Sequence, residues 1–140
     1  MGAPVGDLAC LTGHMATILL VEGDPLQAFL TMAVLGRQFV DVYRATDAAE
    51  ALCLVEQPDF ASKLSLVISG HQIPGITGPA FVAELHSRMP QMPVLVLASA
   101  ETMPTDYTDQ PVAFLHRPFL PEKMLSMTRE MLSHHRNAVV

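Results

Sequence analysis

"LSLVISGHQIPGITG", residues 64–78, joins a short run of branched apolar residues to a segment of turn-forming residues. The apolar run predicts a buried strand over Leu64–Ser69, and the proline and glycines that follow predict a loop. Gly70 lies at the junction between them. In a parallel sheet, ligands bind beyond the carboxyl ends of the strands. Gly70 therefore stands where chemistry is expected, yet it has no side chain.

Outward from this strand, short apolar runs alternate with amphipathic helical segments. The other predicted strands are Thr17–Val21, Phe39–Ala45, Pro93–Ala98 and Val112–His116. Helices are predicted from Pro25 to about Gly36, from Ala48 until Pro58 ends the helix, from Pro79 to Met89, and after Leu120. This alternation predicts an α/β fold, a flavodoxin-like doubly wound parallel sheet of five strands in one domain, with strand order 2-1-3-4-5.

Two helices have a clear apolar face. In the first, positions i, i+3, i+4, i+7 and i+8 are apolar, and we expect this face to pack on the sheet; the residues are Leu26, Phe29, Leu30, Ala33 and Val34. In the last, positions i, i+4, i+7 and i+11 are apolar, and this helical spacing favours core packing over a partner groove; the residues are Leu120, Met124, Met127 and Met131. Between these elements, residues 99–111 contain two prolines and few apolar residues, so only a short or distorted helix is expected there.

Composition limits the class of protein. The chain has 140 residues, of which 50% are hydrophobic and 16% charged, which indicates a folded, soluble domain. Its net charge of -6 argues against binding to nucleic acid or to an anionic membrane. No lysine or arginine precedes Arg37, so the start lacks the basic region of a signal peptide and a cytoplasmic location is expected.

Three parts of the chain are expected from these patterns. Residues 1–15 form an N-terminal extension, and "GHM" before Ala16 resembles a cloning remnant, although it is equally compatible with a native sequence. Residues 16–134 form the folded domain, and residues 135–140 form a fraying tail.

Four segments at the predicted strand ends carry a family resemblance. "ILLVEGDP", "LVISGHQIPGITG", "VLVLAS" and "FLHRPF" resemble the motifs of the receiver (CheY-like) domain of two-component response regulators, over about Thr17 to Leu132. In that family an aspartate at the end of the third strand accepts a phosphoryl group from a histidine kinase. Two acidic residues after the first strand hold Mg²⁺, a hydroxyl after the fourth contacts the phosphoryl oxygen, and a lysine after the fifth pairs with it.

Carried over by position, the resemblance implies that the acceptor is missing. Gly70 occupies the acceptor position and offers no atom to a phosphoryl group. Glu22 matches the first acidic residue, but Gly23 stands where the principal Mg²⁺ ligand is expected, with Asp24 next to it. A requirement for positive φ would explain one glycine at most. The substitutions together favour a receiver that is not phosphorylated at the usual position.

The switch positions depart from the family pattern as well. Ala98 occupies the hydroxyl position, with Ser99 one residue later, and Phe114 is the aromatic residue on the fifth strand to which that hydroxyl couples in receivers. Arg117 replaces the lysine, which keeps the charge and changes its geometry. An ion pair between Arg117 and Glu22 would fill the vacated pocket.

The resulting hypothesis is a degenerate receiver that acts as an interaction module and not as an enzyme. Its expected partners are a histidine kinase, a phosphotransferase or an output protein, bound through the last strand and neighbouring helices, where a homodimer could also form. No cofactor is expected, and only Glu22 and Asp24 are candidates for weak Mg²⁺ binding. Two alternatives stay open. One is phosphorylation at another residue such as His71, which is otherwise expected to be solvated; the other is a small-ligand site between Glu22, Gly70 and Arg117.

Overall fold

A parallel sheet of five strands forms the centre of the molecule. The computed structural model describes residues 16–100, 102–107 and 110–139, with side chains described to residue 133. The strands are β1 (Thr17–Val21), β2 (Asp41–Ala45), β3 (Leu64–Gly70), β4 (Val94–Ala98) and β5 (Val112–His116). Their order is β2-β1-β3-β4-β5, and every neighbouring pair is parallel. The predicted fold class and strand order are confirmed.

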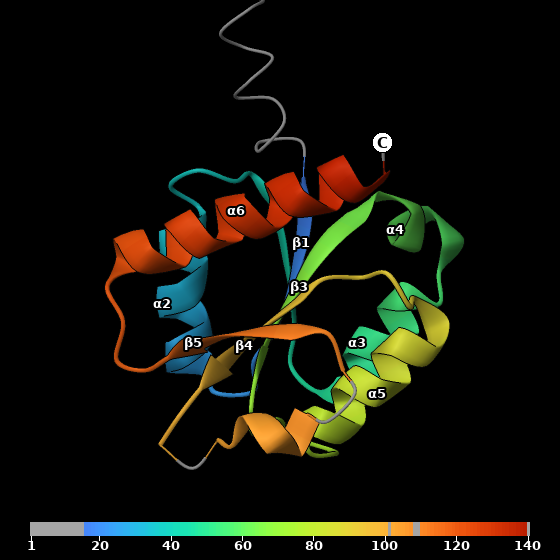
Figure 1. Cartoon of the computed structure of the whole chain (residues 1–140). Coiled ribbons are helices and arrows are strands. Elements are labelled where there is room, and N and C mark those ends of the chain that lie inside the picture. Colours follow the sequence, from blue (N-terminus) through green and yellow to red (C-terminus); the bar gives the residue numbers. More distant parts are fainter. Residues whose placement is uncertain (1–15, 101, 108–109, 140) are drawn as a thin grey trace, which may run out of the picture.

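Helices cover both faces of the sheet, as the alternating pattern predicts. They are α2 (Pro25–Leu35), α3 (Ala48–Val55), α4 (Pro58–Lys63), α5 (Gly78–Arg88), the 3-10 helix η1 (Pro104–Tyr107) and α6 (Pro121–Val139). In Figure 1, α2 and α6 lie on one face, and α3, α4 and α5 lie on the other. Each face has its own apolar cluster, with Phe81 and Leu85 in one and Leu35 and Met124 in the other. The sheet is therefore the middle of three layers.

Side-chain caps set the starts of three helices. Asp24 accepts hydrogen bonds from the amides of Leu26 and Gln27 at the start of α2. Asp47 accepts one from the amide of Glu50 at α3, and Thr77 caps α5. These side chains satisfy amides that have no partner within the helix. Each cap follows directly from a local sequence signal.

The apolar face of α2 points away from the sheet, so the predicted orientation of this helix is wrong. Leu26, Phe29 and Leu30 are 62%, 70% and 48% exposed. The buried residues of the helix are Ala28, Thr31 and Leu35. Two of these three are small, which lets the helix lie close to the strands beneath it. Periodicity shows that a helix has an apolar face, but it does not show what covers that face.

Smaller differences concern helix ends. Pro58 was expected only to end a helix, but it also begins α4, because proline fits the first turn. Leu120 precedes α6 and is 72% exposed, since Pro121 starts the helix one residue later. The backbone of α6 continues to Val139, through the segment predicted to fray. Residues 1–15, the predicted extension, lie outside the described residues. Within the described part of the chain, no helix has the length and apolarity needed to cross a membrane.

The orientation of α2 predicts opposite effects for two leucine truncations. Leu35→Ala should lower the free energy of unfolding by about 2–5 kcal/mol, because it opens a cavity in the core. In the dilute monomer, Leu26→Ala should change it by no more than about 0.5 kcal/mol, because the side chain is already in solvent. Urea unfolding followed by circular dichroism measures both. A large loss for Leu26→Ala with a small one for Leu35→Ala would contradict the observed orientation.

Candidate functional site

Four chain segments meet at the carboxyl edge of the sheet. Gly70 ends β3 and is aligned with Leu97 of β4. The amide of Glu22, directly after β1, donates to the carbonyl of Ala45 at 3.1 Å, and the amide of Arg117 donates to the carbonyl of Ala98 at 2.9 Å. The main chain thus brings the predicted site positions Glu22, Gly70, Ala98 and Arg117 to one edge.

Arg117 and Glu22 form the expected ion pair at this edge. Nη2 of Arg117 lies 3.5 Å from Oε1 of Glu22, whose side chain is 10% exposed. Nη1 of Arg117 donates to Oε1 of Gln27 at 2.8 Å. The second carboxylate oxygen of Glu22 accepts from the amide of Asp24 at 3.1 Å. The buried carboxylate is therefore compensated by groups of the protein itself.

The backbone does not require glycine at position 70. Its φ lies outside the left-handed region, whereas Gly75 has φ of 104°. A Cβ at position 70 would lie 3.6 Å from the carbonyl oxygen of Gln72 and 3.7 Å from Oε1 of Glu22, which are ordinary van der Waals distances. Neither conformation nor space therefore explains Gly70. A positive φ, considered above as a structural reason for one glycine, does not apply here.

Gly23 has a steric reason that the sequence did not show. A Cβ at this position would lie 2.6 Å from Cγ and Cδ of Pro74, so the proline ring fills the space that a side chain would need. Asp24 points elsewhere, because its Oδ1 caps α2 through the amide of Leu26 at 2.9 Å. Oδ1 of Asp24 is thus engaged at the start of α2, and both carboxylate oxygens of Glu22 have partners within the protein. Across residues 16–133, apart from the gaps, no group of three potential metal ligands is found.

At the end of β4, alanine stands at the position of the family's hydroxyl. Ala98 is completely buried. The next residue, Ser99, belongs to a local turn: its amide donates to Oγ1 of Thr102 at 2.9 Å, and the two hydroxyl oxygens are 3.4 Å apart. Ser99, one residue after the expected hydroxyl position, thus interacts with Thr102 at the start of the β4–β5 connection.

Tyr107 is a site residue that sequence reasoning missed. Helix η1 buries it to 3% exposure, and its hydroxyl lies 2.9 Å from Nδ1 of His71 in a hydrogen bond. The ring packs edge-on against Phe114, with centroids 5.4 Å apart. His71 is therefore not simply solvated, as the sequence predicted. In the sequence, the signal for this residue was that Tyr107 is aromatic and lies within the mostly polar segment 99–111.

Gly78 makes room for this contact. A Cβ at position 78 would overlap both the hydroxyl oxygen of Tyr107 and the carbonyl oxygen of His71. The amide of Gly78 also donates to that carbonyl at 3.0 Å. Tyr107 thus connects η1 to the β3–α5 loop, which follows Gly70 directly.

Alanine substitutions of Gly70 and Gly78 should have different effects on the free energy of unfolding. Gly70→Ala should leave the free energy of unfolding unchanged or raise it by up to about 1 kcal/mol, because alanine restricts the unfolded chain at no steric cost. Gly78→Ala should lower it by about 1–3 kcal/mol, because the methyl group overlaps backbone and phenol. Urea unfolding of the two variants gives the comparison. Equal destabilisation would show that Gly70 has a structural role after all.

Burial raises the pKa of Tyr107 to about 12, and the nearby charge of Asp106 acts in the same direction. The chain has two tyrosines and no tryptophan, so in Tyr43→Phe the phenolate absorbance reports Tyr107 alone. We expect it to titrate near 12 in the folded variant. Because the folded pKa exceeds the unfolded value of about 10, stability from this group is complete below pH 10 and falls as pH rises toward 12. Titration at pH 10 in the folded variant would contradict this environment.

Comparisons with known proteins agree with this geometry. The family model for the response regulator receiver domain matches residues 18–129. The uncharacterized transcriptional regulatory protein YbdJ of Bacillus subtilis (strain 168) is 28% identical over 120 residues, which are 84% of this chain and 51% of that protein. This chain thus spans about half the length of that curated relative.

Solved structures share the fold. The chemotaxis response regulator CheY4 of Vibrio cholerae has 25% identity and a TM-score of 0.70, with coverage of 84% of this chain and 98% of that one. A probable two-component system response regulator/GGDEF domain protein has 26% identity and a TM-score of 0.81, with coverage of 96% and 57%. With the family match over most of its length, this chain belongs to the response regulator receiver domain family.

Proposed function

We propose that this receiver is not phosphorylated at the end of β3 and that it acts through contacts with other proteins. Gly70 carries the proposal. It lies at the strand end where Glu22 and Arg117 converge, and phosphoryl transfer to a protein needs a nucleophilic side-chain atom there. Since neither φ nor space requires glycine, its presence is best explained by a site that no longer needs a nucleophile.

The neighbours of Gly70 support a state that does not depend on phosphate. Arg117, at the position of the family's lysine, pairs with Glu22 and Gln27, so its charge is already compensated. Ala98 cannot form the hydrogen bond that would couple the site to Phe114. Phe114 instead packs on Tyr107, which is held by His71. These contacts favour one constitutive conformation of the β4–β5 region.

The two alternatives receive less support from the geometry. Among other phosphoryl acceptors, Asp24 is engaged as the cap of α2 and Nδ1 of His71 is bonded to Tyr107. For a small ligand, the space between Glu22 and Arg117 is spanned by their own ion pair. The interaction module therefore accounts for more of the contacts than either alternative.

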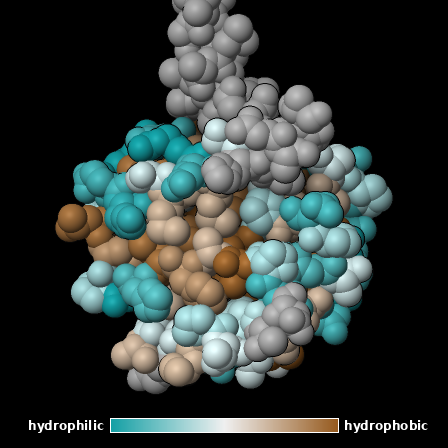
Figure 2. All heavy atoms as spheres, in the orientation of Figure 1, coloured by the Kyte–Doolittle hydropathy of each residue, from teal (hydrophilic) through white to brown (hydrophobic). Residues whose placement is uncertain are grey.

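The surface over β5 and α6 supports a protein partner. β5 is an edge strand of the sheet, and edge strands offer unpaired backbone groups. Figure 2 shows hydrophobic surface across the middle of this face, next to the hydrophilic band over α6. β5 and α6 contribute partly buried apolar residues to this surface, namely Val112, Ala113, Phe114, Met127 and Met131. We propose that a histidine kinase, a phosphotransferase or an output protein binds here.

Beryllofluoride with Mg²⁺, which mimics an aspartyl phosphate, tests the missing acceptor. In the parent protein we expect no shift of the backbone amide signals of Glu22, Gly70, His71 and Arg117 in two-dimensional NMR spectra. Mg²⁺ alone is the control for metal binding. Shifts of these amides with beryllofluoride in the parent would mean that the site still recognises a phosphoryl-like ligand, and the proposal would fail.

Gly70→Asp provides the matched variant. A Cβ at position 70 would make only ordinary van der Waals contacts, so we expect the variant to fold as the parent does. If the missing acceptor is the sole reason for the lost response, the amide signals of Gly70→Asp should shift when beryllofluoride and Mg²⁺ are added. If they do not, the changes at Gly23 and Ala98 also contribute to the loss. Either result leaves the parent spectrum as the test of the proposal.

A further inference from the structure

Helix α2 presents to solvent an apolar face without a charge. Its sequence, PLQAFLTMAVL, contains no acidic or basic residue. Phe29 is 70% exposed and Leu26 62% exposed, the largest values for apolar residues on any described helix. Exposed apolar surface of this kind on a folded domain marks a site of contact. The site at the carboxyl edge of the sheet makes no use of this face.

The exposed residues run along most of the helix. At about 100° per residue, the exposed Leu26, Phe29, Leu30 and Ala33 lie on the side away from the buried Ala28 and Leu35. Val34, at the edge of this face, is partly buried against the core. The exposed face therefore spans about two turns, which is enough to pack against a second helix.

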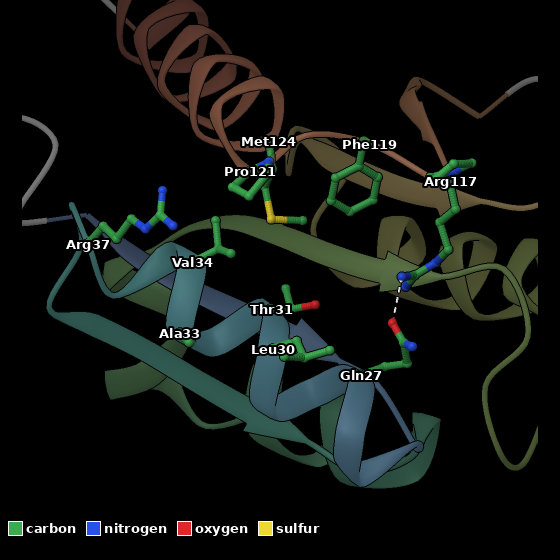
Figure 3. A pocket seen from close by; sticks show the side chains of 11 residues that line it. Gln27, Leu30, Thr31, Ala33, Val34, Arg37, Arg117, Phe119, Pro121 and Met124 are labelled. Atoms are coloured by element: carbon green, nitrogen blue, oxygen red, sulfur yellow. Dashed lines mark hydrogen bonds between the residues drawn. The ribbon is translucent and has the colours of Figure 1, made fainter.

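A groove extends the face on one side. A cavity of about 650 Å³ lies between α2 and the segment from Arg117 to Met124. Figure 3 shows Leu30 and Val34 of α2 on one wall, and Phe119 and Met124 across from them. Leu120, which lies between two lining residues, is also exposed. The apolar surface thus continues from the helix across the groove.

We propose that this face pairs two copies of the chain, with the α2 helices antiparallel about a two-fold axis near Leu30. In this arrangement Leu30 packs against the Leu30 of the other copy, and the exposed Leu26, Phe29 and Ala33 surround this contact. A two-fold contact uses the same patch on both copies and closes without further association.

The charges at the two ends of α2 favour a second copy of the chain as the partner of this face. Asp24 begins α2 and Arg37 follows it, with no charge between them. Antiparallel pairing places Asp24 of each copy beside Arg37 of the other, whereas parallel pairing would place like charges together. Arg37 is available because its present contact, with Glu122 at 3.5 Å, is an exposed and therefore weak ion pair. A partner of uniform charge would be attracted to one end and repelled at the other.

The proposal does not rest on the missing phosphoryl acceptor, and it assigns self-association to α2 and not to the last strand. Sedimentation equilibrium of the full chain should show a mass that rises with concentration from 15.2 kDa toward twice that value. Leu30→Glu should keep the protein monomeric, because it places a charge on the axis. Val40→Glu changes an apolar residue that is 79% exposed outside this face, and it should leave the dimer intact.

The end charges give a second test. Arg37→Glu should weaken the dimer by roughly tenfold over its two symmetric contacts. Asp24→Asn keeps a helix cap while removing the charge. It should weaken the dimer in the parent and strengthen it in Arg37→Glu, and this change of sign is specific to a contact between the two residues.

Three results would overturn the proposal. The first is a folded monomer at every concentration. The second is a dimer that survives Leu30→Glu but is lost in His116→Glu, which would place the contact at β5. The third is a monomer that binds a helical segment of a different protein through α2, which would assign the face to another occupant.

Discussion

Main-chain hydrogen bonds between parallel strands determine where every functional group of this domain lies. They align the ends of β1, β3, β4 and β5 within one edge, so residues nearly a hundred positions apart, such as Glu22 and Arg117, become neighbours. The central strands can supply this edge because their side chains are buried on both faces, which holds the backbone in place. The site is therefore a product of the sheet, and its individual side chains can change without loss of the fold.

The retained charges at this edge show how a receiver site can stay ordered without phosphate. A buried carboxylate needs a partner, and a guanidinium near it satisfies that need. Here one oxygen of Glu22 pairs with Nη2 of Arg117, and the other accepts a hydrogen bond from the amide of Asp24. Gln27 accepts a hydrogen bond from Nη1 of the same guanidinium. In the receiver family, the lysine at the position of Arg117 pairs with the phosphoryl group. Under the proposed function, the ion pair of Arg117 with Glu22 takes the place of that contact.

A second set of contacts links this edge to the β4–β5 connection. Tyr107 bonds to His71 and packs on Phe114, and Gly78 leaves the space for its hydroxyl. Under the proposed function, this buried, hydrogen-bonded tyrosine holds the β4–β5 connection in one conformation. The groove beside the apolar face of α2 is lined by Gln27 and Arg117, so this face borders the ion pair at the carboxyl edge of the sheet.

Much of the fold and of the site could be predicted from sequence. Apolar runs of five to seven residues located the strands, and their alternation with helices implied the strand order, because parallel strands need crossovers of one hand. Gly70, Glu22 and Arg117 were identified because they lie in strand-end motifs that resemble those of the receiver family, and such motifs are local features. The orientation of α2, the bond between Tyr107 and His71, and the overlap of Gly23 with Pro74 were decided only by the tertiary structure. Each depends on how closely segments distant in the chain approach, and no local period or motif encodes that distance.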